Sequence, residues 1–520
     1  MFDELTCRKT SAIPKASFYA PASIAYNEAL HTKSHILFQF RGIHGTRFDP
    51  YDLFILIKMI NALSLKVSKT VLLMVGLVNV LILIPLLLLY KHEDAKSLLY
   101  SSTAFKKLGQ HLDPLMYTSE TYRQWGWHLE RTNVKFRFTN PMGKSGSPEE
   151  VLANNKAVYE AELAKEVTEP KDVDLTDLRP PDKKLIDQYV RANATIIALV
   201  RNQEMASIRR TIRRFENSFN SKYRYPYTFI NDEPFTQRFK DKMAQTTEAP
   251  LNFVVIPPQL WDKPGFIDVT RELEAMNIMA NHNIAYAKKA SYHNMCRFYL
   301  GNFYNVPELK QFKYYWRIEP NVDFFTDVQY DVLKYMEKAK KVYGFTVNLY
   351  DIDETVATLW PETLNFLNQG DNYKYVNPNG AHQWLLENKQ NPKKNVVAGG
   401  YSTCHFWSNF EIGDMDFFRS EAYSEWFKYL DSTGKFYYER WGDAPVHSIG
   451  LALFADKKDI HWFRDLGYEH DPYYNCPNNP KTSRCTVGKF SRWKHLDDQN
   501  CMANWFQLLM SSKDTSYFEE

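Results

Sequence analysis

The 520-residue chain lacks the short motifs that mark the commonest nucleotide-dependent and metal-dependent enzymes. It holds no P-loop, no G-x-G-x-x-G turn, no H-E-x-x-H helix, no C-x-x-C pair and no G-x-S-x-G turn. The sequence therefore gives no support for P-loop nucleotide hydrolysis, for a Rossmann dehydrogenase, for a zincin or for an α/β-hydrolase.

Cysteine and net charge are both low. Six cysteines are too few for a fold built on disulfides. The last five are Cys296, Cys404, Cys476, Cys485 and Cys501. In an oxidising compartment they predict one or two disulfide bridges and one free thiol, with the pairing open. The net charge of +3 predicts no nucleic-acid partner.

Apolar and aromatic residues are abundant instead. Hydrophobic side chains make up 44% of the chain and aromatic ones 15%, which is ample for a large core. The length allows two or three average domains, or one large α/β enzyme with appendages. A high aromatic share is expected where sugar rings stack on Trp and Tyr faces, although large cores use aromatics too.

One run, Val71–Tyr90, carries no charge. Its length matches the hydrocarbon thickness of a bilayer at helical rise, so it predicts one transmembrane helix. That length and the distance from the N-terminus are unlike a cleaved signal peptide. Lysines flank both ends of the run, so charge does not decide its orientation.

Composition divides the rest of the chain. Residues 1–70 predict an N-terminal tail without a domain, in which Met59 is an alternative start. Residues 91–180, which are rich in charge and proline, predict a stem that spaces a folded domain from the membrane. Residues 181–520 predict that folded domain. Asn193 begins the only Asn-X-Ser/Thr site, which a lumenal protein allows to be glycosylated.

The texture of the chain becomes regular after residue 192. Thr195–Asn202, Tyr225–Phe235 and Leu251–Pro258 are short apolar runs typical of strands. Met205–Phe219 lies between the first two and is typical of a helix with basic residues. Strands that alternate with helices over this length predict an α/β sheet with crossover connections.

A further apolar run, Tyr314–Ile318, leads into Glu319-Pro320. Proline fixes φ and removes a backbone donor, so the strand is expected to stop there and leave the carboxylate at its end. Ligands of open α/β sheets bind beyond the carboxyl ends of strands. Glu319 is therefore a candidate ligand for a divalent cation; the alternative is a solvated or salt-bridged glutamate at a turn.

Four strings occur in order along the chain: YWRIEPNVDFF (315–325), YSTCHFWSNFEIGDMDFFRS (401–420), FYYERWGDAPVHSIGLALF (436–454) and GYEHDPYYNCP (467–477). Together they resemble the fungal Golgi α-1,2-mannosyltransferase family, glycosyltransferase family fifteen. The resemblance implies a GT-A-like α/β domain, with a mixed central sheet flanked by helices, behind one transmembrane helix and a stem. It also implies a type II Golgi membrane protein with a cytosolic N-terminus and a lumenal catalytic domain.

The resemblance assigns a metal site. It implies that Glu319 and His470 hold Mn²⁺, and carboxylate, imidazole and diphosphate oxygens suit this cation. The ion would stabilise the charge that develops on departing GDP. Asp351-Ile-Asp353 and Asp414-Met-Asp416 match the D-x-D pattern of other transferases, but about two such triplets are expected by chance in a chain of this length.

The resemblance also assigns the reacting groups. Donor and product are both α-linked, so the configuration is retained. Glu411 is implied either as the nucleophile of a double displacement or as a carboxylate that stabilises an oxocarbenium ion during front-face attack. Its structural alternative is a buried glutamate paired with arginine. Tyr292 is implied near the reacting groups, Asp443 on the acceptor side, and Arg201 is a candidate for binding the donor.

Three further residues have competing interpretations. Trp407 and Trp441 are candidate stacking faces for sugars, although core packing is the more frequent role of tryptophan. His447 begins an apolar run and is interpreted as a core residue or as a support for the site.

The sequence thus predicts a retaining mannosyltransferase. It would move mannose from GDP-mannose to a mannose hydroxyl, with α-1,2 linkage, on N-linked or O-linked glycans or cell-wall mannan. The alternative is a non-catalytic member that binds glycans or partner transferases. Association with other Golgi transferases is a further hypothesis.

Overall fold

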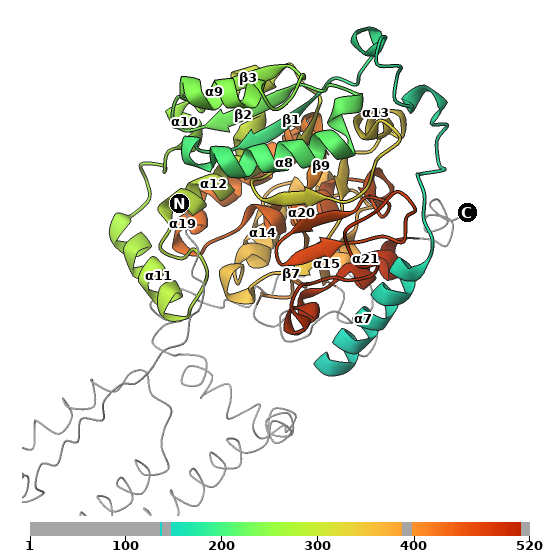
Figure 1. Ribbon diagram of the computed structural model, residues 1–520. Coiled ribbons are helices and arrows are strands. Elements are labelled where there is room, and N and C mark those ends of the chain that lie inside the picture. Colours follow the sequence, from blue (N-terminus) through green and yellow to red (C-terminus); the bar gives the residue numbers. More distant parts are fainter. Residues whose placement is uncertain (1–135, 138–146, 387–397, 511–520) are drawn as a thin grey trace, which may run out of the picture. The chain divides into compact units, whose positions relative to one another are not determined.

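A seven-stranded mixed sheet forms the centre of the folded unit (Figure 1). The computed structural model describes residues 136–137, 147–386 and 398–510. Two smaller sheets, of three and two strands, accompany it. The strands of all three sheets are β1 Ala194–Leu199, β2 Tyr227–Asn231, β3 Leu251–Val255, β4 Tyr314–Arg317, β5 Val322–Phe324, β6 Tyr343–Phe345, β7 Asn348–Tyr350, β8 Cys404–Phe406, β9 Glu411–Asp414, β10 Ile460–Trp462, β11 Tyr468–His470 and β12 Tyr473–Asn475.

Helices connect the strands and cover the sheet (Figure 1). They are α7 Pro148–Ala164, α8 Met205–Ser218, α9 Gln237–Ala244, α10 Pro258–Trp261, α11 Val269–Asn281, α12 Ala290–Gly301, α13 Val332–Lys338, α14 Leu359–Leu367, α15 His382–Leu386, α17 Met415–Phe418, α18 Glu421–Ser432, α19 Lys435–Tyr438, α20 Asp443–Phe454 and α21 Met502–Leu509. The strands and the helix predicted between residues 195 and 258 are confirmed as β1, α8, β2 and β3.

The order of the strands is β10-β6-β9-β4-β1-β2-β3. All are parallel to their neighbours except β9, which is antiparallel to both β4 and β6. A smaller sheet, β12-β11-β5, begins a few residues after the end of β4. The end of β4 therefore lies where the main sheet and the smaller sheet meet.

Side chains of β4 alternate between the two faces of the main sheet, as expected for a strand. Trp316 packs on Phe215 of α8, with ring centres 4.8 Å apart. Tyr315 belongs to the core cluster on the other face, together with Phe298 of α12. Arg317 has the same parity as Tyr315 and therefore faces the α12 side, which is the side that carries the candidate site.

The folded unit begins earlier than the sequence predicts. The predicted stem reaches residue 180, but α7 packs against the rest of the unit, and its Tyr159 and Leu163 are buried in the core. Glu162 binds Arg464 through an ion pair of 2.9 Å. Ser147 caps α7 in a capping box with Glu150, which fixes where the helix starts. The stem interpretation is therefore wrong for this segment.

Other predictions concern residues that the structure does not describe. The tail 1–70, the start at Met59, the membrane run Val71–Tyr90 and residues 91–135 lie outside the described residues. In the described ranges, no helix is long and apolar enough to cross a bilayer.

The cysteines behave as the sequence predicts. Cys404 is bonded to Cys501, and Cys476 to Cys485, whereas Cys296 is free and buried. The first bridge links β8 to the start of α21 across 97 residues of sequence, so it fixes the C-terminal segment to the core.

Asp465 makes the stability of this fold depend on pH. Burial raises the pKa of its carboxyl group to about 7, although Tyr330 donates a hydrogen bond of 2.9 Å to Oδ2. Because the folded-state pKa is the higher one, the folded state binds more protons, and stability falls as pH rises from about 4 to about 7. We expect Asp465→Asn to raise the free energy of unfolding at pH 8 by on the order of 4 kcal/mol.

Urea unfolding of both proteins at pH 4 and pH 8 measures this effect. The variant is expected to show a smaller loss of stability between the two pH values than the wild-type chain. An equal loss in both proteins would contradict the role given to Asp465.

Candidate active site

Two charged residues lie opposite each other in the centre of the sheet. The antiparallel pairing of β4 and β9 places Arg317 directly across from Glu411. Opposed residues of neighbouring strands project to the same face, so these side chains meet. Arg317 Nη1 is 3.5 Å from Glu411 Oε1, and both side chains are buried.

Arg317 collects two more carboxylates. Nη1 donates a hydrogen bond of 2.6 Å to Asp443 Oδ2, and Nη2 donates one of 2.5 Å to Glu319 Oε1. The guanidinium also lies 3.6 Å from the ring centre of Tyr299 in α12. We call Arg317, Glu319, Glu411 and Asp443 the Arg317 cluster. Three carboxylates surround one guanidinium, so the cluster carries excess negative charge when all three are ionised.

Asp443 is the first residue of α20 and is held in its ionised form. Burial alone would raise its pKa, but the charge and hydrogen bond of Arg317, with a hydrogen bond from Ser408, lower the pKa below its ordinary value. Both hydrogen bonds end on Oδ2, at 2.6 Å from Arg317 and 2.9 Å from Ser408. Among the described residues none donates to Oδ1, which therefore remains able to accept.

Glu411 is completely buried, and both of its oxygens have partners. Tyr343 donates a hydrogen bond of 3.0 Å to Oε2, and His447 Nδ1 lies 3.1 Å from the same oxygen. His447 Nε2 lies 3.2 Å from the carbonyl oxygen of Tyr299. His447, predicted to be a core residue or a support for the site, is both: it is buried and it contacts Glu411.

Glu319 and His470 meet at the exposed edge of the cluster. The smaller sheet pairs His470 of β11 with Val322 of β5, shortly after Glu319. His470 Nε2 is consequently 3.8 Å from Glu319 Oε2, and both side chains are partly exposed. Glu319 also forms a salt bridge with Arg317. It is therefore both a salt-bridged glutamate, as the alternative prediction had it, and a candidate metal ligand.

The donors present fit a metal ion such as Mn²⁺. Glu319 Oε2 and His470 Nε2 face each other, and the excess negative charge of the Arg317 cluster favours a cation beside it. No group of three or more ionisable ligands occurs in the described ranges. The remaining ligands would therefore have to come from bound substrate and water.

Tyr292 reaches the site through a different set of contacts. Its hydroxyl accepts a hydrogen bond of 3.1 Å from Arg440 Nη1 and contacts the thiol of Cys296, which in turn contacts the backbone of Asp443. Burial raises the pKa of the Tyr292 hydroxyl well above its ordinary value, so the phenol stays protonated. Tyr292 thus lies on the Asp443 side of the site.

Arg201 is not in contact with the cluster. It follows β1, the parallel neighbour of β4, so it lies at the same edge of the sheet. Its side chain is 54% exposed and forms an ion pair of 3.0 Å with Glu204. Its role in donor binding stays a prediction.

The two tryptophans differ. Trp407 is partly exposed, and its ring centre lies 5.2 Å from that of His470, which keeps it a candidate stacking face. Trp441 is fully buried and donates its ring N–H to Glu439 at 2.9 Å, so it is a core residue. The two D-x-D triplets do not join the cluster by any described contact, and Asp414 caps α17.

Several residues of the site are not predicted from the sequence. They are Arg317, Tyr343, Tyr299 and Arg440. The sequence does hold a sign of the role of Arg317, because a charged residue inside an otherwise apolar strand needs an oppositely charged or polar partner when it is buried. The tyrosines gave no signal, because buried tyrosine is common in any core.

The chain matches the family model described as glycolipid 2-alpha-mannosyltransferase over residues 149–510. A curated relative, the probable mannosyltransferase KTR4 of Saccharomyces cerevisiae, is 48% identical over 378 residues, which cover 71% of this chain and 80% of the relative. The family predicted from the four strings is therefore confirmed.

Two solved structures have a similar fold. The mannosyltransferase Ktr4p from S. cerevisiae in complex with GDP aligns with a TM-score of 0.69 and 44% identity, over 77% of this chain and all of that one. Core-mannan synthase A from Aspergillus fumigatus, solved in a Mn/GDP form, aligns with a TM-score of 0.61 and 43% identity, over 72% of this chain and 94% of that one. The predicted α/β glycosyltransferase fold with a mixed sheet is confirmed.

Proposed function

Since the chain belongs to the glycolipid 2-alpha-mannosyltransferase family and is a mannosyltransferase, we propose that it transfers mannose from GDP-mannose to a mannose hydroxyl of a glycan. The linkage formed is α-1,2, and the configuration is retained. The observation that supports this most is the buried Arg317 cluster beside the Glu319–His470 pair. The relative solved with manganese and GDP supports the same choice of donor and cation.

Glu411 supplies negative charge to the reaction. Transfer builds positive charge on the mannosyl ring, and a fixed carboxylate stabilises that charge without having to reorganise. A nucleophile must touch the anomeric carbon, but the Glu411 carboxylate is covered by Arg317, Tyr343 and His447. This geometry favours front-face attack, in which Glu411 acts electrostatically, over a covalent glycosyl intermediate.

Glu319 and His470 hold the cation. When bound, Mn²⁺ acts as a Lewis acid that stabilises the negative charge of the departing diphosphate. Arg317 fixes the orientation of Glu319 by binding Oε1, which leaves Oε2 directed at His470. Arg201, at the same edge of the sheet, is assigned to the donor as well.

Asp443 and Tyr292 form the acceptor side. Asp443 Oδ1 accepts a hydrogen bond from a hydroxyl of the acceptor mannose, while Arg317 and Ser408 keep the carboxylate ionised and oriented through Oδ2. The protonated phenol of Tyr292 lies beside it and orients the acceptor or the departing phosphate.

We place the enzyme in the Golgi membrane, with the catalytic unit in the lumen. The two disulfide bonds support an oxidising compartment. N-linked glycans, O-linked glycans and cell-wall mannan are the acceptor classes assigned to it. Peptide mapping of the enzyme purified from its host, with and without reduction, checks whether the bridges form there.

Mannose transfer by the full-length chain tests the proposal. We expect GDP-mannose and α-methyl mannoside to give a disaccharide with Mn²⁺ and none with excess EDTA, and NMR to identify an α-1,2 linkage. We also expect Glu319→Gln and His470→Gln each to raise the Mn²⁺ concentration needed for half-maximal activity by about 10–100-fold. Activity in EDTA, or an unchanged Mn²⁺ requirement in both variants, would contradict the assigned metal site.

A further inference from the structure

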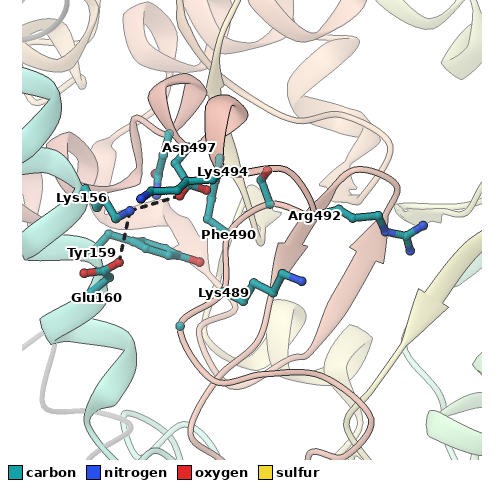
Figure 2. Close-up of a pocket in the computed structure, with 11 residues that line it drawn as sticks. Lys156, Tyr159, Glu160, Lys489, Phe490, Arg492, Lys494 and Asp497 are labelled. Atoms are coloured by element: carbon teal, nitrogen blue, oxygen red, sulfur yellow. Dashed lines mark hydrogen bonds and ion pairs between the residues drawn. The ribbon is translucent and has the colours of Figure 1, made fainter.

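A pocket lies between α7 and the C-terminal part of the chain (Figure 2). Its volume is about 330 Å³. Helix α7 contributes Lys156, Tyr159 and Glu160, and residues 488–500 contribute the opposite wall. The Arg317 cluster does not line it, so this pocket is separate from the candidate active site.

Two lysines of this pocket have no carboxylate partner in the described part of the chain. Lys156 is paired with Asp497 at 3.2 Å and with Glu160 at 3.8 Å, as the dashed lines of Figure 2 show. Lys489 approaches the ring of Tyr474, at 5.3 Å, and Lys494 has no partner among the described residues. The pocket therefore holds two solvent-exposed ammonium groups that form no ion pair with a carboxylate of the described residues.

Arg492, a further cation of the pocket wall, forms ion pairs with residues beside the candidate active site. It binds Glu469 at 2.9 Å and Asp471 at 3.2 Å, the two residues that flank His470. The wall of the pocket is thus joined directly to the segment that carries a proposed metal ligand.

A series of aromatic rings also connects the pocket with His470. The ring centres of Tyr159 and Phe490 are 5.6 Å apart, and those of Phe490 and Tyr473 are 5.5 Å apart. Tyr473 lies 5.1 Å from Trp407, and Trp407 lies 5.2 Å from His470. We call these five residues the aromatic row. Trp407 and Tyr473 are partly exposed, and flat apolar ring faces of this kind suit the apolar faces of sugars.

We propose that the pocket binds a phosphate ester carried by the acceptor glycan, at a sugar some units away from the hydroxyl that receives mannose. The inference rests on the proposed function. Lys489 and Lys494 make charge-assisted hydrogen bonds to the phosphate oxygens, and their two charges match those of a phosphate monoester. Trp407 and Tyr473, the two partly exposed rings that this row brings beside His470, lie along the sugars between the phosphate and the metal-binding edge, whereas Tyr159 and Phe490 are buried.

Binding of mannose 6-phosphate to the full-length chain tests the pocket without any need for catalysis. Calorimetric titrations in EDTA, without GDP-mannose, compare mannose 6-phosphate, α-methyl mannoside and inorganic phosphate. We expect saturable binding of mannose 6-phosphate, at least about 10-fold tighter than either other ligand and weakened by salt. Inorganic phosphate that binds equally tightly would show a simple anion site and overturn the proposal.

A double variant locates the site. Lys489→Ala with Lys494→Ala is expected to weaken binding of mannose 6-phosphate by about 10-fold or more, because both charged partners are removed. Lys310→Ala, which removes an exposed lysine outside the pocket, is the matched control and is expected to leave binding unchanged. Equal binding by the double variant and the control would overturn the proposal.

The test separates this inference from the proposed function. Wild-type chain that transfers mannose to α-methyl mannoside but shows no saturable binding of mannose 6-phosphate defeats the pocket alone. Chain that binds mannose 6-phosphate through Lys489 and Lys494 but transfers no mannose defeats the proposed function, and it overturns the acceptor role of the pocket while leaving an anionic-sugar site.

Discussion

Replacing Glu411 with glutamine is expected to lower the rate of mannose transfer by about 10²–10³-fold and to leave GDP binding intact. Glutamine keeps the size of the side chain and can still accept from Tyr343, but it removes the negative charge. Glu411 is completely buried, so water cannot replace that charge. The turnover number with GDP-mannose and α-methyl mannoside measures the first effect, and calorimetry with GDP measures the second.

Glu362→Gln is the matched control. Glu362 is also paired with a cation, Lys435 at 2.6 Å, but it is only partly buried, belongs to α14 and has no described contact with the Arg317 cluster. Its substitution should leave transfer close to the wild-type rate. Near-normal turnover of Glu411→Gln would remove the catalytic assignment of that residue.

The same position separates the two retaining mechanisms. Glu411→Ala opens a space that azide can enter. If Glu411 were a nucleophile, azide would attack the donor in its place and give β-mannosyl azide. We expect no such product, because the buried carboxylate acts electrostatically. Formation of β-mannosyl azide would show covalent catalysis instead.

Replacing Arg317 with methionine is expected to lower the free energy of unfolding by about 3–5 kcal/mol and to abolish transfer. The substitution leaves Glu319, Glu411 and Asp443 without their common cation, and two of these carboxylates are fully or almost fully buried. Removing one partner of a buried ion pair lowers stability by more than the pair contributes to it, because the remaining charge stays buried without a partner.

The loss is expected to depend on pH. Arg317 is what lowers the pKa of Asp443 against the effect of burial, so in the variant that pKa rises. A raised folded-state pKa means that stability is lost as pH increases. The deficit of the variant should therefore be smaller at pH 5 than at pH 8 in urea unfolding. An equal deficit at both values would show that lost packing, rather than charge, explains it.

Two companion variants isolate the charge effect. Arg201→Met removes an arginine that is largely exposed and paired with Glu204, so it should cost less than about 1 kcal/mol. Asp443→Asn added to Arg317→Met removes one uncompensated charge and is expected to restore part of the lost stability. Failure of the double variant to recover any stability would contradict the charge explanation.

The chemistry of the site was more predictable than its assembly. Glu319, Glu411, Asp443 and His470 lie in motifs that the family strings identify, and all four lie together in the structure. The strand before Glu319 and the helix after β1 follow from apolar periodicity alone. What sequence does not contain is the pairing of β4 with β9, which joins residues 94 apart and places Arg317 against Glu411.

Two further residues show the same limit. His447 stands in an apolar helix and is read correctly as buried, but its contact with Glu411 depends on how α20 rotates against the sheet. Glu162 looks like one more charge of a polar spacer, yet it binds the buried guanidinium of Arg464, which is 302 residues away in sequence. Nothing local to either residue encodes its partner.

The docking of α7 has a practical consequence for where the enzyme can be cut. This helix packs against α21, so the first and last helices of the described catalytic unit are in contact. Tyr159 and Leu163 lie in the main core, and burying such side chains stabilises by about 1.5–3 kcal/mol each. A secreted form that starts at residue 181 would expose that core, whereas a protease nick between α7 and β1 would leave the two pieces attached to each other.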